Sequence, residues 1–154
     1  MRQRWVQIAL LAVALFAINV IARLVIRIGL AENDSAENTV SIIMFAAIGI
    51  VLAAVTFVRA QRTPPSSWLP ELAAAAIGGM LLTILVGPFV SGDSPFSGGA
   101  GNFFSQVWLY GGCAIVGTLL GYWIATALGV EHRSQTLKAY AKAKLAKPRR
   151  VVRR

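Results

Sequence analysis

The sequence predicts an all-α fold: a polytopic membrane protein with a four-transmembrane-helix bundle and a basic cytoplasmic C-terminal tail. Hydrophobic residues make up 56% of the 154-residue chain and charged residues only 14%, whereas a soluble domain carries about 25% charged residues. The apolar residues form four long blocks, each near the roughly 20 residues that a helix needs to cross the hydrocarbon core. Unpaired backbone groups are not tolerated in lipid, so each block is expected to be helical.

The four helices are expected at residues 5–30, 40–58, 69–90 and 103–128. Residues 1–130 then form the bundle, and residues 131–154 form the tail. The breaks between the blocks are rich in Pro, Gly, Ser, Asn and charge, as is typical of turns. Pro70 is expected in the first turn of the third helix, where proline is tolerated, and Pro88 is expected to kink or end that helix. The basic start resembles a signal peptide, but its apolar run is longer than a signal core, so we interpret it as the first helix.

The distribution of Lys and Arg predicts how the chain is threaded. Of the fifteen Lys and Arg residues, only Arg23 and Arg27 fall on the side opposite the N-terminus, so thirteen share the N-terminal side. Cytoplasmic segments carry the excess of Lys and Arg. We therefore expect a multi-pass protein of the cell membrane with both termini in the cytoplasm. The acidic residues between the helices are then outside: Glu32, Asp34, Glu37 and Asp93.

A polar stripe runs along the end of the first helix. Asn19, Arg23 and Arg27 are four residues apart, which places them within one quadrant of the helix. Heptad steps extend this face backward through Trp5, Ala9, Ala12 and Phe16. Small residues let helices approach closely, so we expect this face to pack against the other helices. Apolar residues that cover much of the rest of the helix are expected in lipid: Leu10, Leu11, Leu15, Ile18, Ile21 and Val25.

Two interpretations of the arginines remain open. If the first helix ends near Ala22, both arginines extend into the outer headgroups. If it continues to about Leu30, Arg23 lies roughly 10 Å below the helix end. It would then contact an anion, a lipid phosphate or a carboxylate, because guanidinium matches these groups by paired hydrogen bonds.

The fourth helix carries small residues every four positions: Cys113, Gly117, Gly121 and Ala125. Such a ladder lets two helix backbones touch, either within the bundle or with another chain. In the third helix, Glu71 is expected in the first turn, where a helix N-terminus favours negative charge. Five aromatic residues are expected as anchors at or near the membrane interface: Trp5, Trp68, Trp108, Tyr110 and Trp123, of which Trp123 lies deepest.

The tail is expected to bind anionic lipid through its basic residues: Lys138, Lys142, Lys144, Lys147, Arg149 and Arg150. Each basic residue near an anionic surface contributes about 1 kcal/mol. The tail has one aromatic residue, Tyr140, and no RNA-binding motif, so no nucleic-acid partner is expected.

The sequence offers few groups for chemistry. One cysteine, Cys113, and one histidine, His132, provide neither a disulfide nor a zinc ligand set. No nucleophile lies beside a base in the apolar blocks. We expect neither enzyme activity nor a cofactor or metal.

Three functions are consistent with these features. The first is a non-catalytic accessory or structural subunit of a membrane complex, whose partners are membrane lipids and other membrane protein chains in a hetero- or homo-oligomer. The alternative is a small homo-oligomeric channel or carrier for an anion or anionic lipid, with Asn19, Arg23 and Arg27 as its site. The third is a phage-type holin, suggested by small size and a charged tail.

Overall fold

The computed structural model describes residues 2–29, 34–92, 94, 96 and 99–145. Over these residues it contains helices and turns and no strand. The elements are α1 (Arg2–Gly29), α2 (Asp34–Arg62), α3 (Pro65–Leu81), the π-helix η1 (Leu82–Val86), α4 (Gly87–Ser91), α5 (Gly99–Ala127) and α6 (His132–Leu145).

Four stretches are long and apolar enough to cross a membrane. They are Arg4–Ile28, Thr39–Arg62, Pro65–Val90 and a window within Gly99–Leu145. The prediction of an all-helical chain with four such helices is therefore confirmed over the described residues.

The helices extend beyond the predicted bounds at several ends. α2 begins at Asp34 and ends at Arg62, whereas residues 40–58 were expected. Its end is set by Pro64, because the residue before a proline is disfavoured in a helix. α3 begins at Pro65, four residues earlier than predicted, since a proline at the first helical position gives up no hydrogen bond. Pro70 consequently lies inside α3 and not in its first turn.

Pro88 was expected to kink or end the third helix. The structure shows instead that the helix changes to π geometry just before this proline. The proline has no N–H, and its ring crowds the carbonyl four residues earlier. Here the chain widens into the π-turn η1, in which the N–H of Gly87 bonds to the carbonyl of Leu82. The five residues of α4 then end at Gly92, whose φ of 88° is the left-handed conformation that glycine adopts easily.

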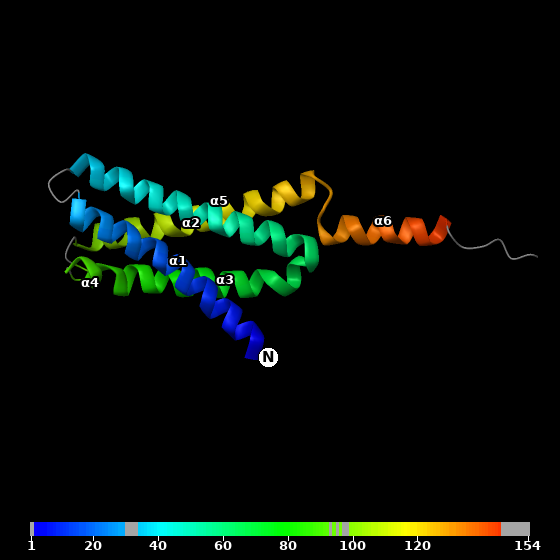
Figure 1. Cartoon of the computed structure of the whole chain (residues 1–154), viewed down its shortest axis with the longest axis horizontal. Helices are drawn as coiled ribbons and strands as arrows, with labels where there is room; N and C mark the ends of the chain where they lie inside the picture. The colour runs from blue at the N-terminus through cyan, green and yellow to red at the C-terminus, as the bar shows by residue number, and fades with distance from the viewer. Residues whose placement is uncertain (1, 30–33, 93, 95, 97–98, 146–154) are drawn as a thin grey trace, which may run out of the picture.

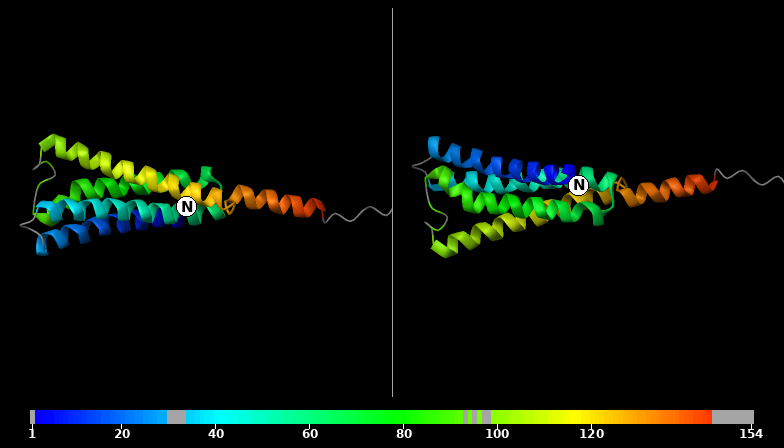
Figure 2. Two further views of the ribbon diagram at one scale, coloured as in Figure 1. Left: turned by 90° about the horizontal axis from the view of Figure 1, so that it is seen from above. Right: turned by 90° about the horizontal axis from the view of Figure 1, so that it is seen from below.

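The four long helices form an elongated bundle (Figure 1). α1 packs along α3 and α2, and α5 packs along α2, but α5 and α3 approach each other only over a short stretch. The start of α5 diverges from the other helices at one end of the bundle (Figure 2). The buried core includes Leu15, Ile48, Leu52, Leu72 and Ala125.

The buried face of α1 differs in part from the predicted one: Ala12 and Asn19 are buried as expected, but other positions are not. Leu15 is 0% exposed and Leu11 is 9% exposed, although both were expected in lipid, whereas Trp5 is 69% exposed. Ala9 is exposed as well. A straight α-helix drifts about 20° per heptad away from a strict 3.5-residue repeat. In addition, the start of α1 angles away from the bundle (Figure 1), so its first turns lie apart from the packed face.

α6 leaves the bundle after a glycine turn. The N–H of Gly129 bonds to the carbonyl of Thr126, and the N–H of Val130 bonds to the carbonyl of Ala125. This is the Schellman pattern of a helix C-terminus, and Gly129 has the positive φ, 61°, that it requires. The Lys138 ammonium donates to the Gly129 carbonyl at 3.0 Å. α6 projects beyond the bundle (Figure 1) and has no buried residue.

Candidate functional site

The small-residue ladder of α5 lies against α2. A Cβ atom built on Gly117 would overlap the backbone carbonyl of Gly49, and one built on Gly121 would overlap that of Ala53. Ala125, one step further along, is 0% exposed. A Cβ on Gly49 would lie 3.2 Å from the carbonyl oxygen of Cys113, which is itself half-buried. The helix backbones therefore touch within this chain, and only glycine fits at the two central positions.

The polar stripe of α1 lies at the end of the bundle that holds α4. Asn19 is 1% exposed. Its amide nitrogen lies 3.1 Å from the sulfur of Met44 on α2, and its Oδ1 accepts a hydrogen bond from Arg23 Nε at 3.0 Å. A Cβ built on Gly87 would lie 2.7 Å from Asn19 Oδ1 and 3.0 Å from Arg23 Nε. The stripe therefore packs on the bare backbone of Gly87.

Arg27 extends the same stripe to the end of α4. Its guanidinium donates to the carbonyl of Val90 at 3.0 Å, where a helix C-terminus favours positive charge. α1 continues to Gly29, so it does not end near Ala22. Of the nearby acidic residues, Glu32 and Asp93 lie outside the described residues, and nothing is described of the side chains of Asp34 and Glu37.

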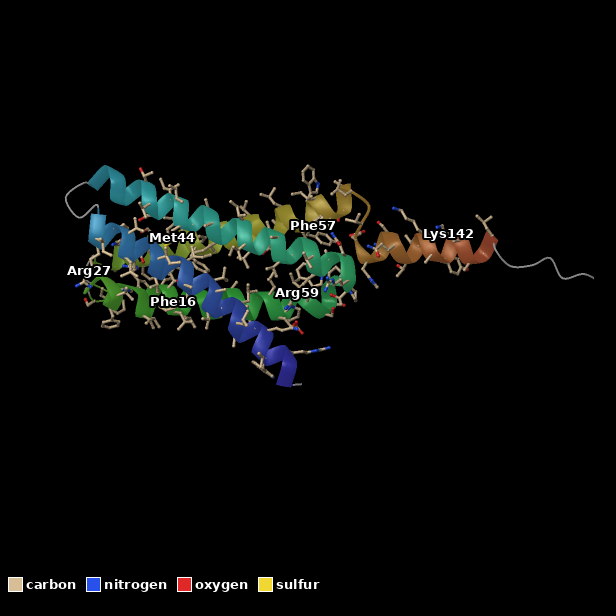
Figure 3. The ribbon with its side chains drawn as sticks, viewed as in Figure 1. Phe16, Arg27, Met44, Phe57, Arg59 and Lys142 are labelled. Atoms are coloured by element: carbon tan, nitrogen blue, oxygen red, sulfur yellow. The ribbon has the colours of Figure 1, made fainter. Side chains whose placement is uncertain are left out.

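A second polar group lies at the opposite end of the bundle and was not predicted. Arg59 donates to the Glu71 carboxylate at 2.6 Å and to Gln7 Oε1 at 3.4 Å. Arg4 Nε lies 3.6 Å from the other carboxylate oxygen of Glu71. These residues border a cleft of about 520 Å³ that Arg62 and Trp68 also line, here named the Glu71 cleft. Figure 3 shows Arg59 and Arg27 far apart along the bundle axis.

The prediction that Glu71 lies in the first turn of the third helix is wrong. α3 begins at Pro65 and has no acidic residue in its first turn, so the N-terminal partial charge does not account for Glu71. Its side chain is 18% exposed, and its carboxylate is paired with Arg59. The sequence holds a signal for this pairing: Arg59 and Glu71 flank a Pro-Pro turn between two antiparallel helices.

An apolar groove of about 400 Å³ lies between α3 and α5. We name it the α3–α5 groove. Its lining combines small residues with larger apolar ones: Leu69, Leu72, Ala73, Ala76, Ile77, Met80, Tyr110, Gly111, Ala114, Ile115, Thr118 and Leu119.

Trp68 and Tyr110 are core residues and not lipid-facing anchors. They are 3% and 1% exposed, whereas the other three expected anchors, Trp5, Trp108 and Trp123, are exposed. The Tyr110 hydroxyl lies over Gly79, where a Cβ would be only 2.7 Å from its oxygen. Within the described part of the chain, neither the Tyr110 hydroxyl nor the Trp68 indole N–H has a hydrogen-bond partner.

The tail residues are only partly described. Lys138, Lys142 and Lys144 lie on the exposed helix α6, and Figure 3 shows Lys142 beyond the bundle. Lys147, Arg149 and Arg150 lie outside the described residues.

Among the residues that the structure describes, no three His, Cys, Asp or Glu side chains lie together in a way that could hold a metal ion. Comparisons with protein families, curated proteins and solved structures give no match for this chain.

Proposed function

We propose that this chain is a non-catalytic accessory subunit of a membrane protein complex, and that a transmembrane helix of a partner protein occupies the α3–α5 groove. The observation that carries this proposal is the groove itself. It follows α3 from Leu69 to Met80, and at 1.5 Å per residue this is about 16 Å, or three helical turns. That length suits a helix.

The lining of the groove favours a helix over other occupants. Ala73, Ala76, Gly111 and Ala114 present little side chain, so a second backbone can approach closely. Transmembrane helices associate through close van der Waals packing on such small residues, because lipid provides no hydrophobic driving force between them. Ile77 and Ile115 line the same groove and are 55% and 63% exposed, so a partner helix has large apolar side chains to cover.

The basic tail supports attachment of the complex at the membrane surface. α6 carries Lys138, Lys142 and Lys144 on a helix without buried residues, directly after the last membrane-spanning segment. We propose that it lies on anionic lipid at the cytoplasmic face of the cell membrane, where we expect both termini from the excess of Lys and Arg.

Site-specific photocrosslinking in native membranes tests the proposed subunit role. A benzoylphenylalanine replaces Ala73, which lines the groove, or Ala74, which is also exposed on the same helix but does not line it. We expect one discrete adduct with a different polypeptide from position 73 and none from position 74. The purified adduct is identified by mass spectrometry.

Two outcomes contradict the proposal. Equal crosslinking from both positions means that the groove has no special occupant. An adduct of two copies of this chain, formed only from position 73, points instead to the homo-oligomeric channel or carrier.

A further inference from the structure

We propose that the Glu71 cleft binds the phosphate group of an anionic membrane phospholipid. The cleft shares no lining residue with the α3–α5 groove. The inference therefore goes beyond the proposed subunit role, and either can fail without the other.

The cleft has more positive charge than its own carboxylate can neutralise. Three guanidinium groups, those of Arg4, Arg59 and Arg62, face one carboxylate, that of Glu71. Arg59 already pairs with Glu71 at 2.6 Å. Arg62 makes no hydrogen bond or ion pair with any residue in the described part of the chain. Two positive charges thus remain for an anion, and guanidinium groups match phosphate oxygens with paired hydrogen bonds.

The ion pair with Glu71 also fixes the orientation of the Arg59 side chain. The Arg59 guanidinium is held through two nitrogens, by the Glu71 carboxylate and by Gln7 Oε1. Its side chain is only 21% exposed. A guanidinium has five N–H donors, so Arg59 retains donors while its orientation is fixed, and a bound anion need not order it.

A buried donor in the wall of the cleft lacks an acceptor. Trp68 lines the cleft, is 3% exposed, and has an indole N–H without a hydrogen-bond partner among the described residues. A buried donor left unpaired is destabilising, and indole can only donate. The nitrogen itself is covered by neighbouring atoms, so a phosphate oxygen would reach it only if the side chains that cover it move aside.

The position and the wall of the cleft favour a phospholipid over free phosphate. The cleft lies where α1 begins, α2 ends and α3 begins, which is the end of the spans and so the depth of lipid headgroups. Val55 and Val58 line it as well, and Val58 is 45% exposed. An amphiphile can place its phosphate among the arginines and its apolar part along these valines. The volume of about 520 Å³ falls in the range of small-molecule sites.

Native mass spectrometry of the full chain in non-ionic detergent tests this site. The protein is titrated with phosphatidylglycerol or with phosphatidylcholine, and bound lipids per chain are counted. In the double variant R4Q/R62Q, the affinity for the first phosphatidylglycerol should fall by about tenfold or more, because two charges near the headgroup are lost. The matched control K142Q/K144Q removes the same charge from α6 and should lose less than about threefold.

Two further arms separate folding and ligand source. R4Q/R62Q should unfold at the same temperature as the wild type, because among the described residues these two side chains make a single long ion pair, Arg4 to Glu71 at 3.6 Å, and no hydrogen bond. Trp68→Phe should lower the affinity for the first phosphatidylglycerol by roughly fivefold, because the indole donor is lost. Millimolar inorganic phosphate should not displace the lipid.

The proposal is overturned if the α6 control loses as much affinity as R4Q/R62Q, or if phosphatidylcholine binds as tightly as phosphatidylglycerol. Displacement of the lipid by inorganic phosphate overturns the assignment to a phospholipid.

Discussion

Gly117 and Gly121 are the positions at which adding one methyl group should matter most. Each lies against a backbone carbonyl of α2, which cannot rotate away as a flexible side chain could. Gly117→Ala or Gly121→Ala should therefore destabilise the bundle by about 1–3 kcal/mol, as overpacking does. Detergent-denaturation curves followed by circular dichroism measure the change.

Gly111 and Gly112 on the same helix provide the control. A Cβ built on either meets no atom within 4 Å. Alanine there should leave stability unchanged or raise it by up to about 1 kcal/mol, since alanine is the better helix former. If all four substitutions have equal effects, the α2–α5 backbone contact is not what stabilises the bundle.

Arg23 is the second residue for which the contacts make a sharp prediction. Arg23→Leu leaves the buried Oδ1 of Asn19 without its donor, and a buried unpaired acceptor costs about 1–3 kcal/mol. Lysine should not fully rescue it, because a lysine side chain has a methylene where arginine has Nε.

Arg27 serves as the comparison for that prediction. Its bond to the Val90 carbonyl is exposed, so Arg27→Leu should cost less than Arg23→Leu, and lysine should replace it well. Unfolding temperatures of the four variants decide this. If lysine serves equally at both positions and leucine costs little at either, the arginines act only by extending into the headgroups.

For single residues, the face of the helix on which they lie was easier to predict than the groups that they contact. The spacing of Asn19, Arg23 and Arg27 placed them on one face, and the structure describes them along one side of α1 against Met44, Gly87 and Val90. The pairing of Arg59 with Glu71 was missed, because it depends on how α2 and α3 meet across the Pro-Pro turn. The sequence of one helix alone does not show how two helices pack against each other.

At the scale of elements, apolar blocks predicted the helices but not their ends. Helix ends depend on prolines and caps: Pro65 starts α3 earlier than hydropathy suggested, and Pro88 produces the π-turn η1 in place of a simple kink. The buried face of α1 was predicted from a heptad repeat, and it failed at Leu11 and Leu15 because a straight helix drifts away from that repeat.

α6 is the element whose truncation should leave the bundle intact. It has no buried residue, so deleting residues 138–154 should change the unfolding temperature little. The truncated chain should lose its binding to anionic liposomes. Salt should weaken the binding of the wild type, because the Debye length falls to about 3 Å at 1 M. Liposome flotation with and without salt measures this. Binding that salt does not weaken would contradict an electrostatic tail and indicate apolar insertion.

At the scale of the whole molecule, composition was sufficient for the fold class. A chain with 56% hydrophobic residues and a mean hydropathy of +0.66 cannot form an ordinary soluble domain, and lipid leaves helices as the main solution. Which helices adjoin could not be predicted, because apolar helices of similar composition can pack in several orders. The separation of α3 from α5, and hence the groove, follows from that order.

We propose that this chain crosses the cell membrane four times with its basic end in the cytoplasm, and labelling of single cysteines on intact cells tests that threading. In a Cys113→Ala background, single cysteines replace Ser94, in the turn after α4, or Ser66, at the start of α3; both positions are exposed. An impermeant thiol reagent should label the cysteine at position 94 and should label position 66 only after the cells are opened. Labelling of position 66 but not of position 94 on intact cells would contradict the threading and place the thirteen basic residues outside.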